Sequence, residues 1–263
     1  MYRDEYSRWC KAELVDFDLK RELTEIAGDE DAIRERFAAS LSFGTAGLRG
    51  TLGVGTNRMN IWVVRQATQG IADWVKTKGG SQTVAISYDS RLKGWNFARD
   101  AASVLAANGI QVRLYDELMP VPALSFATRY YNCNAGIMIT ASHNPAKYNG
   151  YKAYGADGCQ VTDEDAAVVY AAIQKTDVLG GAKFMSFAEG VEKGLIRFVG
   201  DDCKEAFYAA VESRQVRPGI CETAGLKLVY SPLNGTGLVP VTRVLKDIGV
   251  EDVTIVKEQE YPN

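Results

Sequence analysis

The stretch Ala135-Gly136-Ile137-Met138-Ile139-Thr140 leads directly into Ala141-Ser142-His143-Asn144-Pro145. Its first part is apolar at successive positions, which is typical of a strand buried on both faces near the centre of a sheet. Pro145 favours extended backbone at Asn144, and the polar residues before it favour a turn, so the strand delivers Ser142 into a loop. Open α/β sheets bind their ligands at such strand ends. The pattern predicts an α/β fold with an exposed serine hydroxyl at the carboxyl end of a central strand.

The segments around this strand have alternating helical and extended patterns. Asn60 can cap a helix that Gly79 ends, and Thr162 with Asp165 resembles a capping box. Together the segments predict a mixed sheet flanked by helices. The other expected elements are helices before Leu41 and over 95–108, 123–131 and 202–213, strands over 83–87, 111–115 and 151–154, and a connector with one or two strands over 180–200.

The last part of the chain predicts a second α/β domain. A strand over 226–230, a helix over 238–248 and a strand over 253–256 form a βαβ unit. A single βαβ unit leaves a face of its sheet uncovered, so this domain is expected to be incomplete. We expect a first domain over 1–200 and the start of a second over 201–263.

Composition narrows the classes of function. The chain has 263 residues, 30 basic against 33 acidic, and a net charge of -3, so nothing attracts it to nucleic acid or to anionic lipid. No apolar run approaches the length of a bilayer span, and the residues after Met1 lack the apolar core of a signal peptide, so we expect a cytoplasmic protein. The five cysteines include no Cys-x-x-Cys pair and are expected to be reduced. His143 is the single histidine, which excludes a multi-histidine metal site.

Ser142 has neighbours that suit a bound phosphoryl group. Serines in such turns usually bond only to the backbone. Here His143 and Asn144 add hydrogen-bonding groups, and Asn149-Gly150-Tyr151-Lys152 returns an ammonium toward the same sheet edge. A phosphoserine carries close to two negative charges and needs cations and convergent donors. A hydrolase serine would need a general base held by a third group, and His143, adjacent in sequence, is expected to point away from Ser142 unless the turn folds sharply.

Three further loops carry polar groups. Phe43-Gly44-Thr45-Ala46-Gly47-Leu48-Arg49-Gly50 spaces a hydroxyl and a guanidinium with glycines that let the backbone approach an oxyanion, although a plain irregular turn fits as well. Tyr88-Asp89-Ser90-Arg91 follows a strand and either supplies polar groups to a site or lets Asp89 cap the next helix. Asn234-Gly235-Thr236-Gly237 could receive a phosphate at a helix N-terminus, but a turn with a cap is the preferred interpretation.

These motifs, in this order and spacing, resemble the α-D-phosphohexomutase superfamily of phosphoglucomutases and phosphomannomutases. The segment 140–145 looks like its phosphoserine loop, 43–50 like its early arginine loop, and 149–152 like the lysine segment after the serine. The long helical lead before Phe43 and the Arg58-Met59-Asn60 segment look most similar to the phosphoglucomutase-2/phosphopentomutase branch.

The resemblance implies an intramolecular phosphotransferase that moves a phosphoryl group between C1 and C6 of a hexose phosphate, or C1 and C5 of a pentose phosphate. Ser142 would carry the phosphoryl group, with glucose 1,6-bisphosphate as activator and Mg²⁺ bridging the serine phosphate. Arg49, Lys152 and His143 would be catalytic, Lys152 also in proton transfer if burial near Arg49 lowers its pKa. Thr45 and Asn144 would join them in binding a small-molecule sugar phosphate.

One departure from the family pattern sets an expectation about completeness. Members hold Mg²⁺ with three aspartates in an Asp-Gly-Asp-x-Asp-Arg loop, and no such stretch occurs before Asn263. We therefore expect the chain to be the N-terminal part of such an enzyme, with little or no activity alone. A phosphosugar-binding or regulatory module without turnover, and a sugar-bisphosphate synthase using the same serine, are the alternatives.

Overall fold

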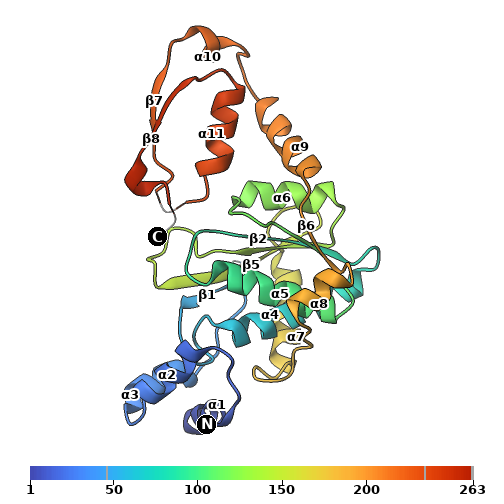
Figure 1. Ribbon diagram of the computed structural model, residues 1–263. Helices are drawn as coiled ribbons and strands as arrows, with labels where there is room; N and C mark the ends of the chain where they lie inside the picture. The colour runs from blue at the N-terminus through green and yellow to red at the C-terminus, as the bar shows by residue number, and fades with distance from the viewer. Residues whose placement is uncertain (46, 234, 262–263) are drawn as a thin grey trace.

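The computed structural model describes residues 1–45, 47–233 and 235–261 of the chain. Its centre is a six-stranded mixed sheet in the order β1-β5-β4-β2-β3-β6 (Figure 1). Strand β4 lies between β5 and β2 and all of its residues are buried, which confirms the prediction of a central strand. The strands are β1 (Leu48–Thr51), β2 (Thr83–Tyr88), β3 (Gln111–Leu114), β4 (Ala135–Ile139), β5 (Tyr148–Gly155) and β6 (Ile196–Phe198).

The strand directions determine which loops meet. β2 is parallel to both β3 and β4, whereas β5 is antiparallel to both β4 and β1. The carboxyl ends of β2 and β4 therefore lie at the same edge of the sheet, followed by residues 89–93 and by residues 140–147, which we call the serine loop. Because the serine loop joins β4 to β5, it also lies beside the start of β5 and the end of β1.

Helices cover both faces of the sheet. Figure 1 shows α6 and α9 over one face, α4, α5, α7 and α8 over the other, and the three N-terminal helices beyond this second layer. Met138 and Tyr154 pack in the α6 layer, whereas the Tyr151 hydroxyl on the opposite face accepts a hydrogen bond from Thr68 of α4. The helices are α1 (Tyr2–Lys11), α2 (Phe17–Glu25), α3 (Glu30–Phe37), α4 (Ile61–Lys78), α5 (Gly94–Ala107), α6 (Val121–Tyr130), α7 (Asp163–Lys175), α8 (Phe187–Glu192) and α9 (Asp201–Glu212).

Local sequence signals explain most of these boundaries. The Asn60 side chain accepts bonds from the Trp62 and Val63 amides, and Gly79 follows the last residue of α4, so this helix begins and ends as predicted. The Thr162 hydroxyl caps α7, but the Asp165 carboxylate does not complete a capping box and instead accepts bonds from Trp74 and Lys78.

Two predicted segments differ from the structure. Strand β5 runs over residues 148–155, longer than the predicted 151–154, because pairing with two neighbours extends it. The stretch over 180–200 contains β6, as predicted, and also α8, which begins at a Ser186 cap that the sequence prediction missed.

The predicted βαβ unit is present. It comprises β7 (Lys227–Tyr230), α11 (Leu238–Asp247) and β8 (Asp252–Ile255), with β7 and β8 paired in parallel. Two short elements accompany it, α10 (Ile220–Thr223) and the 3-10 helix η1 (Lys257–Gln259). Figure 1 shows this unit on the side of the main sheet that α6 covers, joined to it by α9. Division of the chain near residue 200 stays a prediction.

Candidate functional site

Ser142 occupies an unusual backbone conformation at the end of the central strand. It is exposed, and its φ of 58° lies in the left-handed region. That conformation costs a residue with a Cβ roughly 1–2 kcal/mol, so surrounding contacts must stabilise it. Strained residues that the structure holds in place in this way are concentrated at functional sites.

The amide of Ser142 is held through Thr140 and Asp89. The Ser142 N–H donates to Thr140 Oγ1 at 2.9 Å, and the Thr140 hydroxyl in turn donates to Asp89 Oδ2. Asp89 directly follows β2, so this chain of bonds crosses from one strand end to the next. Burial raises the pKa of the Asp89 carboxyl, and the bond from Thr140 opposes that shift only in part.

Arg91 binds the carbonyl groups of the same loop. Its Nη2 donates to Ser142 O at 2.7 Å and Asn144 O at 2.5 Å, and its Nη1 donates to Pro145 O at 3.1 Å and Tyr148 O at 2.9 Å. Its Nε lies 3.5 Å from Asp89 Oδ2, and its side chain is only 11% exposed. A single guanidinium thus binds three carbonyl groups of the serine loop and the first carbonyl group of β5.

Arg49 approaches the serine loop from β1. Its Nη1 donates to Asn144 Oδ1 at 2.8 Å, and the rest of the guanidinium makes no bond to a described residue. Thr45 precedes it in a tight turn that the Gly47 amide closes onto Gly44 O at 2.7 Å, and Thr45 makes no hydrogen bond within the described ranges. Ala46 of this predicted loop lies outside the described residues.

Lys152 lies on the same face of the sheet as Arg49. In the β1–β5 register Arg49 is opposite Gly150, so Lys152 is its diagonal neighbour two residues along β5. Diagonal neighbours in an antiparallel pair are about 7–8 Å apart and share a face. Lys152 is half-buried, and its side chain forms no ion pair or hydrogen bond with the described part of the chain. The register therefore puts two cations on one face, but only Arg49 contacts the serine loop directly.

His143 is closer to Ser142 than the sequence suggested. Its Nδ1 lies 3.3 Å from Ser142 Oγ, so the ring does not point away, and the exception of a sharply folded turn is the case that occurs. The left-handed backbone at Ser142 turns the chain sharply enough to bring adjacent side chains together. Within residues 1–45, 47–233 and 235–261 no carboxylate bonds the imidazole, so the third group of a hydrolase triad is lacking there.

The sequence allowed two interpretations of the segment after β2: that Asp89 and Arg91 supply polar groups to a site, or that Asp89 caps the next helix. The second interpretation is wrong. Asp89 does not cap the following helix, because Lys93 is the residue at the start of α5. Asp89 Oδ1 instead accepts the Arg91 amide at 3.1 Å, and both side chains turn toward the serine loop. One sequence feature could have predicted this arrangement: two buried strands each end in polar residues. Such residues meet at one edge of the sheet when the strands are parallel neighbours, as β2 and β4 are.

The structure gives little support for a metal centre made by this chain alone. No group of three or more His, Cys, Asp or Glu side chains that could hold a metal ion occurs in the described part of the chain. Asp89, the carboxylate connected to the serine loop, is already occupied by Thr140 and Arg91. The residues present do not fit Mg²⁺ on their own.

The same described ranges contain no helix long and apolar enough to cross a membrane.

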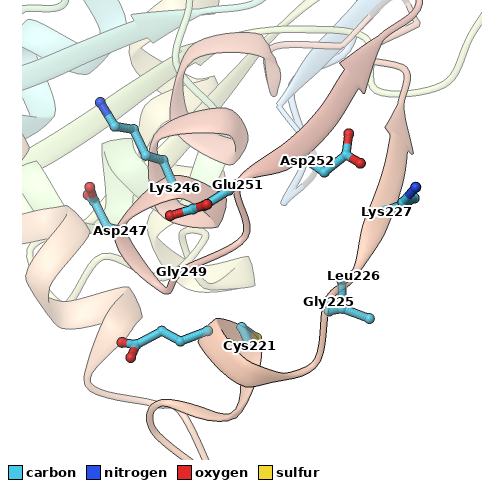
Figure 2. A pocket seen from close by; sticks show the side chains of 10 residues that line it. Cys221, Gly225, Leu226, Lys227, Lys246, Asp247, Gly249, Glu251 and Asp252 are labelled. Carbon is cyan, nitrogen blue, oxygen red and sulfur yellow. The ribbon is translucent and has the colours of Figure 1, made fainter.

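A separate cavity lies in the second unit, between α10, β7, β8 and the end of α11. Its lining includes Lys227 and Lys246 but also four acidic residues, and no residue of the serine loop. Figure 2 shows the ammonium groups of Lys227 and Lys246 on opposite sides, pointing away from each other. They do not converge on one anion, so this cavity does not resemble a phosphate site.

The loop between β7 and α11 adopts a turn. The Gly235 amide donates to Pro232 O at 2.9 Å, and Gly237 precedes the first residue of α11 without a side-chain cap. The turn agrees with the preferred interpretation of this motif as a turn with a cap. The cap residue, Gly237, has no side chain and therefore makes no side-chain hydrogen bond to the helix. Asn234, the first residue of that predicted motif, lies outside the described residues.

Comparison with known proteins identifies the family of this chain. Residues 40–179 match the family model for phosphoglucomutase/phosphomannomutase, alpha/beta/alpha domain I. Phosphoglucomutase of Staphylococcus haemolyticus is 38% identical over 227 residues, which are 85% of this chain and 40% of that protein. Phosphoglucomutase of Staphylococcus saprophyticus is 36% identical over 227 residues, 86% of this chain and 41% of that protein.

Solved structures have the same fold. A putative phosphomannomutase from Thermus thermophilus superposes with a TM-score of 0.70 at 25% identity, covering 86% of this chain and 47% of that one. The chain spans about 40% of the length of the curated relatives it matches. More than half of its residues match the family model, and they include β1, the serine loop and β5. The chain belongs to the phosphoglucomutase/phosphomannomutase family.

Proposed function

We propose that this chain carries the phosphoryl-transferring serine, Ser142, of a phosphosugar mutase. The observation that carries the proposal is an exposed serine held in a left-handed conformation, with Arg49 bonded to its loop at 2.8 Å and His143 3.3 Å from its hydroxyl. An anion attached to Ser142 would be close to a guanidinium that has unused N–H groups. The names of the relatives, phosphoglucomutase and putative phosphomannomutase, support the same reaction.

The proposed reaction consists of two transfers at one oxygen. Phosphorylated Ser142 gives its phosphoryl group to a hydroxyl of a sugar monophosphate: the bond from phosphorus to serine oxygen breaks, a bond to the sugar oxygen forms, and the hydroxyl proton ends on Ser142 Oγ. The resulting bisphosphate returns its other phosphoryl group by the reverse step. The sugar leaves as the isomeric monophosphate and the phosphoserine is restored.

The described residues support separate roles in this reaction. Arg49 would neutralise charge on the transferring phosphoryl oxygens, and Lys152 would add a second cation from the same face. His143 would orient the phosphate or the sugar, and Thr45 and Asn144 would contribute hydrogen bonds to the sugar phosphate. Mg²⁺ would add charge neutralisation when bound, and Ser142 would contact it through its phosphate. Both transfers take place between Ser142 and the sugar phosphate, and the described carboxylates do not form a Mg²⁺ site.

The substrate class follows from the relatives' names and from the resemblance. We infer glucose phosphates as the first substrates to test and glucose 1,6-bisphosphate as the phosphoryl source, with pentose phosphates next if the chain lies in the phosphoglucomutase-2/phosphopentomutase branch. A cytoplasmic location suits such substrates.

Labelling of Ser142 tests the proposal. The 263-residue chain incubated with glucose 1,6-bisphosphate and Mg²⁺ should gain the mass of one phosphoryl group, which peptide mapping should assign to Ser142. Ser142→Ala should gain none, whereas Ser213→Ala, an exposed serine at the end of α9, should label normally. Label on another residue, or equal labelling of Ser142→Ala, would contradict the proposal.

A binding measurement separates transfer from recognition. If the chain binds but does not turn over phosphosugars, as a module would, glucose 1-phosphate should shift the backbone NMR signals of the serine loop and of Arg49 without labelling Ser142. Shifts confined to other regions, with no label, would count against both the mutase and the module.

A further inference from the structure

We propose that Arg91 is the positioning residue of the serine loop: it fixes the backbone on which Ser142 gives and receives its phosphoryl group and does not itself bind phosphate. The inference rests on the proposed function of Ser142 and extends it to a residue outside the three motifs that carry the family resemblance. It follows from the way in which one buried guanidinium is shared among four carbonyl groups.

The outer donors of Arg91 are fully used. A guanidinium has five N–H groups, two on each Nη and one on Nε. The Nη atoms reach the carbonyls of Ser142, Asn144, Pro145 and Tyr148. The Nε is buried, makes no hydrogen bond, and faces the Asp89 carboxylate at 3.5 Å. No accessible donor is left for a phosphate, whereas Arg49 is exposed and makes one bond to the loop.

The bonds clamp Ser142 from both sides. Its N–H is held by Thr140 Oγ1 at 2.9 Å, and its C=O is held by Arg91 Nη2 at 2.7 Å. These two groups lie on either side of the Ser142 Cα, so holding both fixes the φ and ψ that direct Oγ. Asp89 joins the two halves, because it accepts from Thr140 and faces the Arg91 guanidinium.

The far end of the loop is tied to the same segment. The Asn149 side chain donates to Leu92 O at 2.9 Å, one residue after Arg91, while its oxygen accepts the Gly150 amide at 2.7 Å. Residues 89–92 therefore contact the beginning and the middle of the serine loop and the first two residues of β5, which follow it. A displacement of about 1 Å at a reacting atom can cost on the order of 100-fold in rate, so this template matters for the chemistry.

Arg91→Lys is the informative variant, because it keeps the positive charge but cannot form the fork. Arg65→Lys is the matched control: Arg65 is similarly buried at 13% exposure and pairs with Asp100 at 2.8 Å, on α4 rather than at the serine loop. Amide hydrogen exchange of residues 139–149 in the 263-residue chain is the primary measurement. We expect exchange there to rise at least about tenfold in Arg91→Lys while α4 and β2 stay protected, and to be unchanged in Arg65→Lys.

Kinetics of Ser142 labelling supply a readout that a merely structural role would not change. At saturating glucose 1,6-bisphosphate the labelling rate of Arg91→Lys should fall by about 100-fold, with the half-saturating concentration within roughly threefold of the unsubstituted chain. A higher half-saturating concentration with an unchanged maximal rate would make Arg91 a phosphate ligand and overturn the proposal.

Unchanged exchange of residues 139–149 in Arg91→Lys would overturn it as well. If the unsubstituted chain takes up no phosphoryl group, the proposed function fails on that measurement, and the exchange comparison still decides whether Arg91 positions the loop.

Discussion

Gly47 is a residue whose missing side chain shapes the site. It has a φ of +76°, and a Cβ there would lie 1.9 Å from Tyr151 O, inside the backbone of β5. We expect Gly47→Ala to lower the free energy of unfolding by about 3 kcal/mol or more, since left-handed strain and the collision both oppose it. Gly109→Ala is the control, because Gly109 has a φ of +78° with nothing within 4 Å, and it should cost only about 1–2 kcal/mol. Urea unfolding measures the free energy of unfolding of both variants. Equal losses would show that the close approach of Gly47 to the β5 backbone does not add to the cost of the substitution.

Helix α4 depends on one buried side chain at its start. Asn60 accepts the Trp62 and Val63 amides at 3.1 Å and donates to the carbonyls of Gly53 and Gly55 at 2.9 Å. Asn60→Ala removes the cap and leaves two carbonyls without a donor, so we expect a loss of about 2–4 kcal/mol in chemical unfolding. Thr162→Ala removes a single exposed cap bond of α7 and should cost about 1 kcal/mol. A loss at Asn60 no larger than that at Thr162 would mean that the carbonyl bonds contribute nothing.

At the scale of the whole molecule, α9 completes the layer that α6 begins. Cys203, Phe207 and Tyr208 are buried in that layer, and the Phe207 ring lies 5.7 Å from Phe126. We expect a chain of residues 1–213 to be more stable than one of residues 1–200 by about 3–6 kcal/mol, because the shorter chain lacks these side chains and exposes the apolar partners in α6 that they cover. Thermal and urea unfolding of the two chains measure this difference in stability. The same comparison tests whether the first domain ends near residue 200. Equal stability would favour a first domain that ends at 200.

The sequence by itself determined the features that are encoded locally. The apolar run before Ser142 predicted a central strand, Asn60 and Gly79 predicted the ends of α4, and the pattern over 226–256 predicted a βαβ unit. Strand burial, helix capping and helix termination depend on residues within a few positions of one another, so a single stretch of sequence contains the whole signal.

Only the tertiary structure decided how the candidate site is held. The four carbonyl bonds of Arg91 join segments about 50 residues apart, which meet because β2 and β4 are parallel neighbours. These bonds help to hold the left-handed turn at Ser142, and that turn in turn brings His143 close to the serine hydroxyl. No local pattern distinguishes an arginine that binds a ligand from one that binds a loop, because both need the same fork of donors. The difference lies in which acceptors the fold brings to that fork.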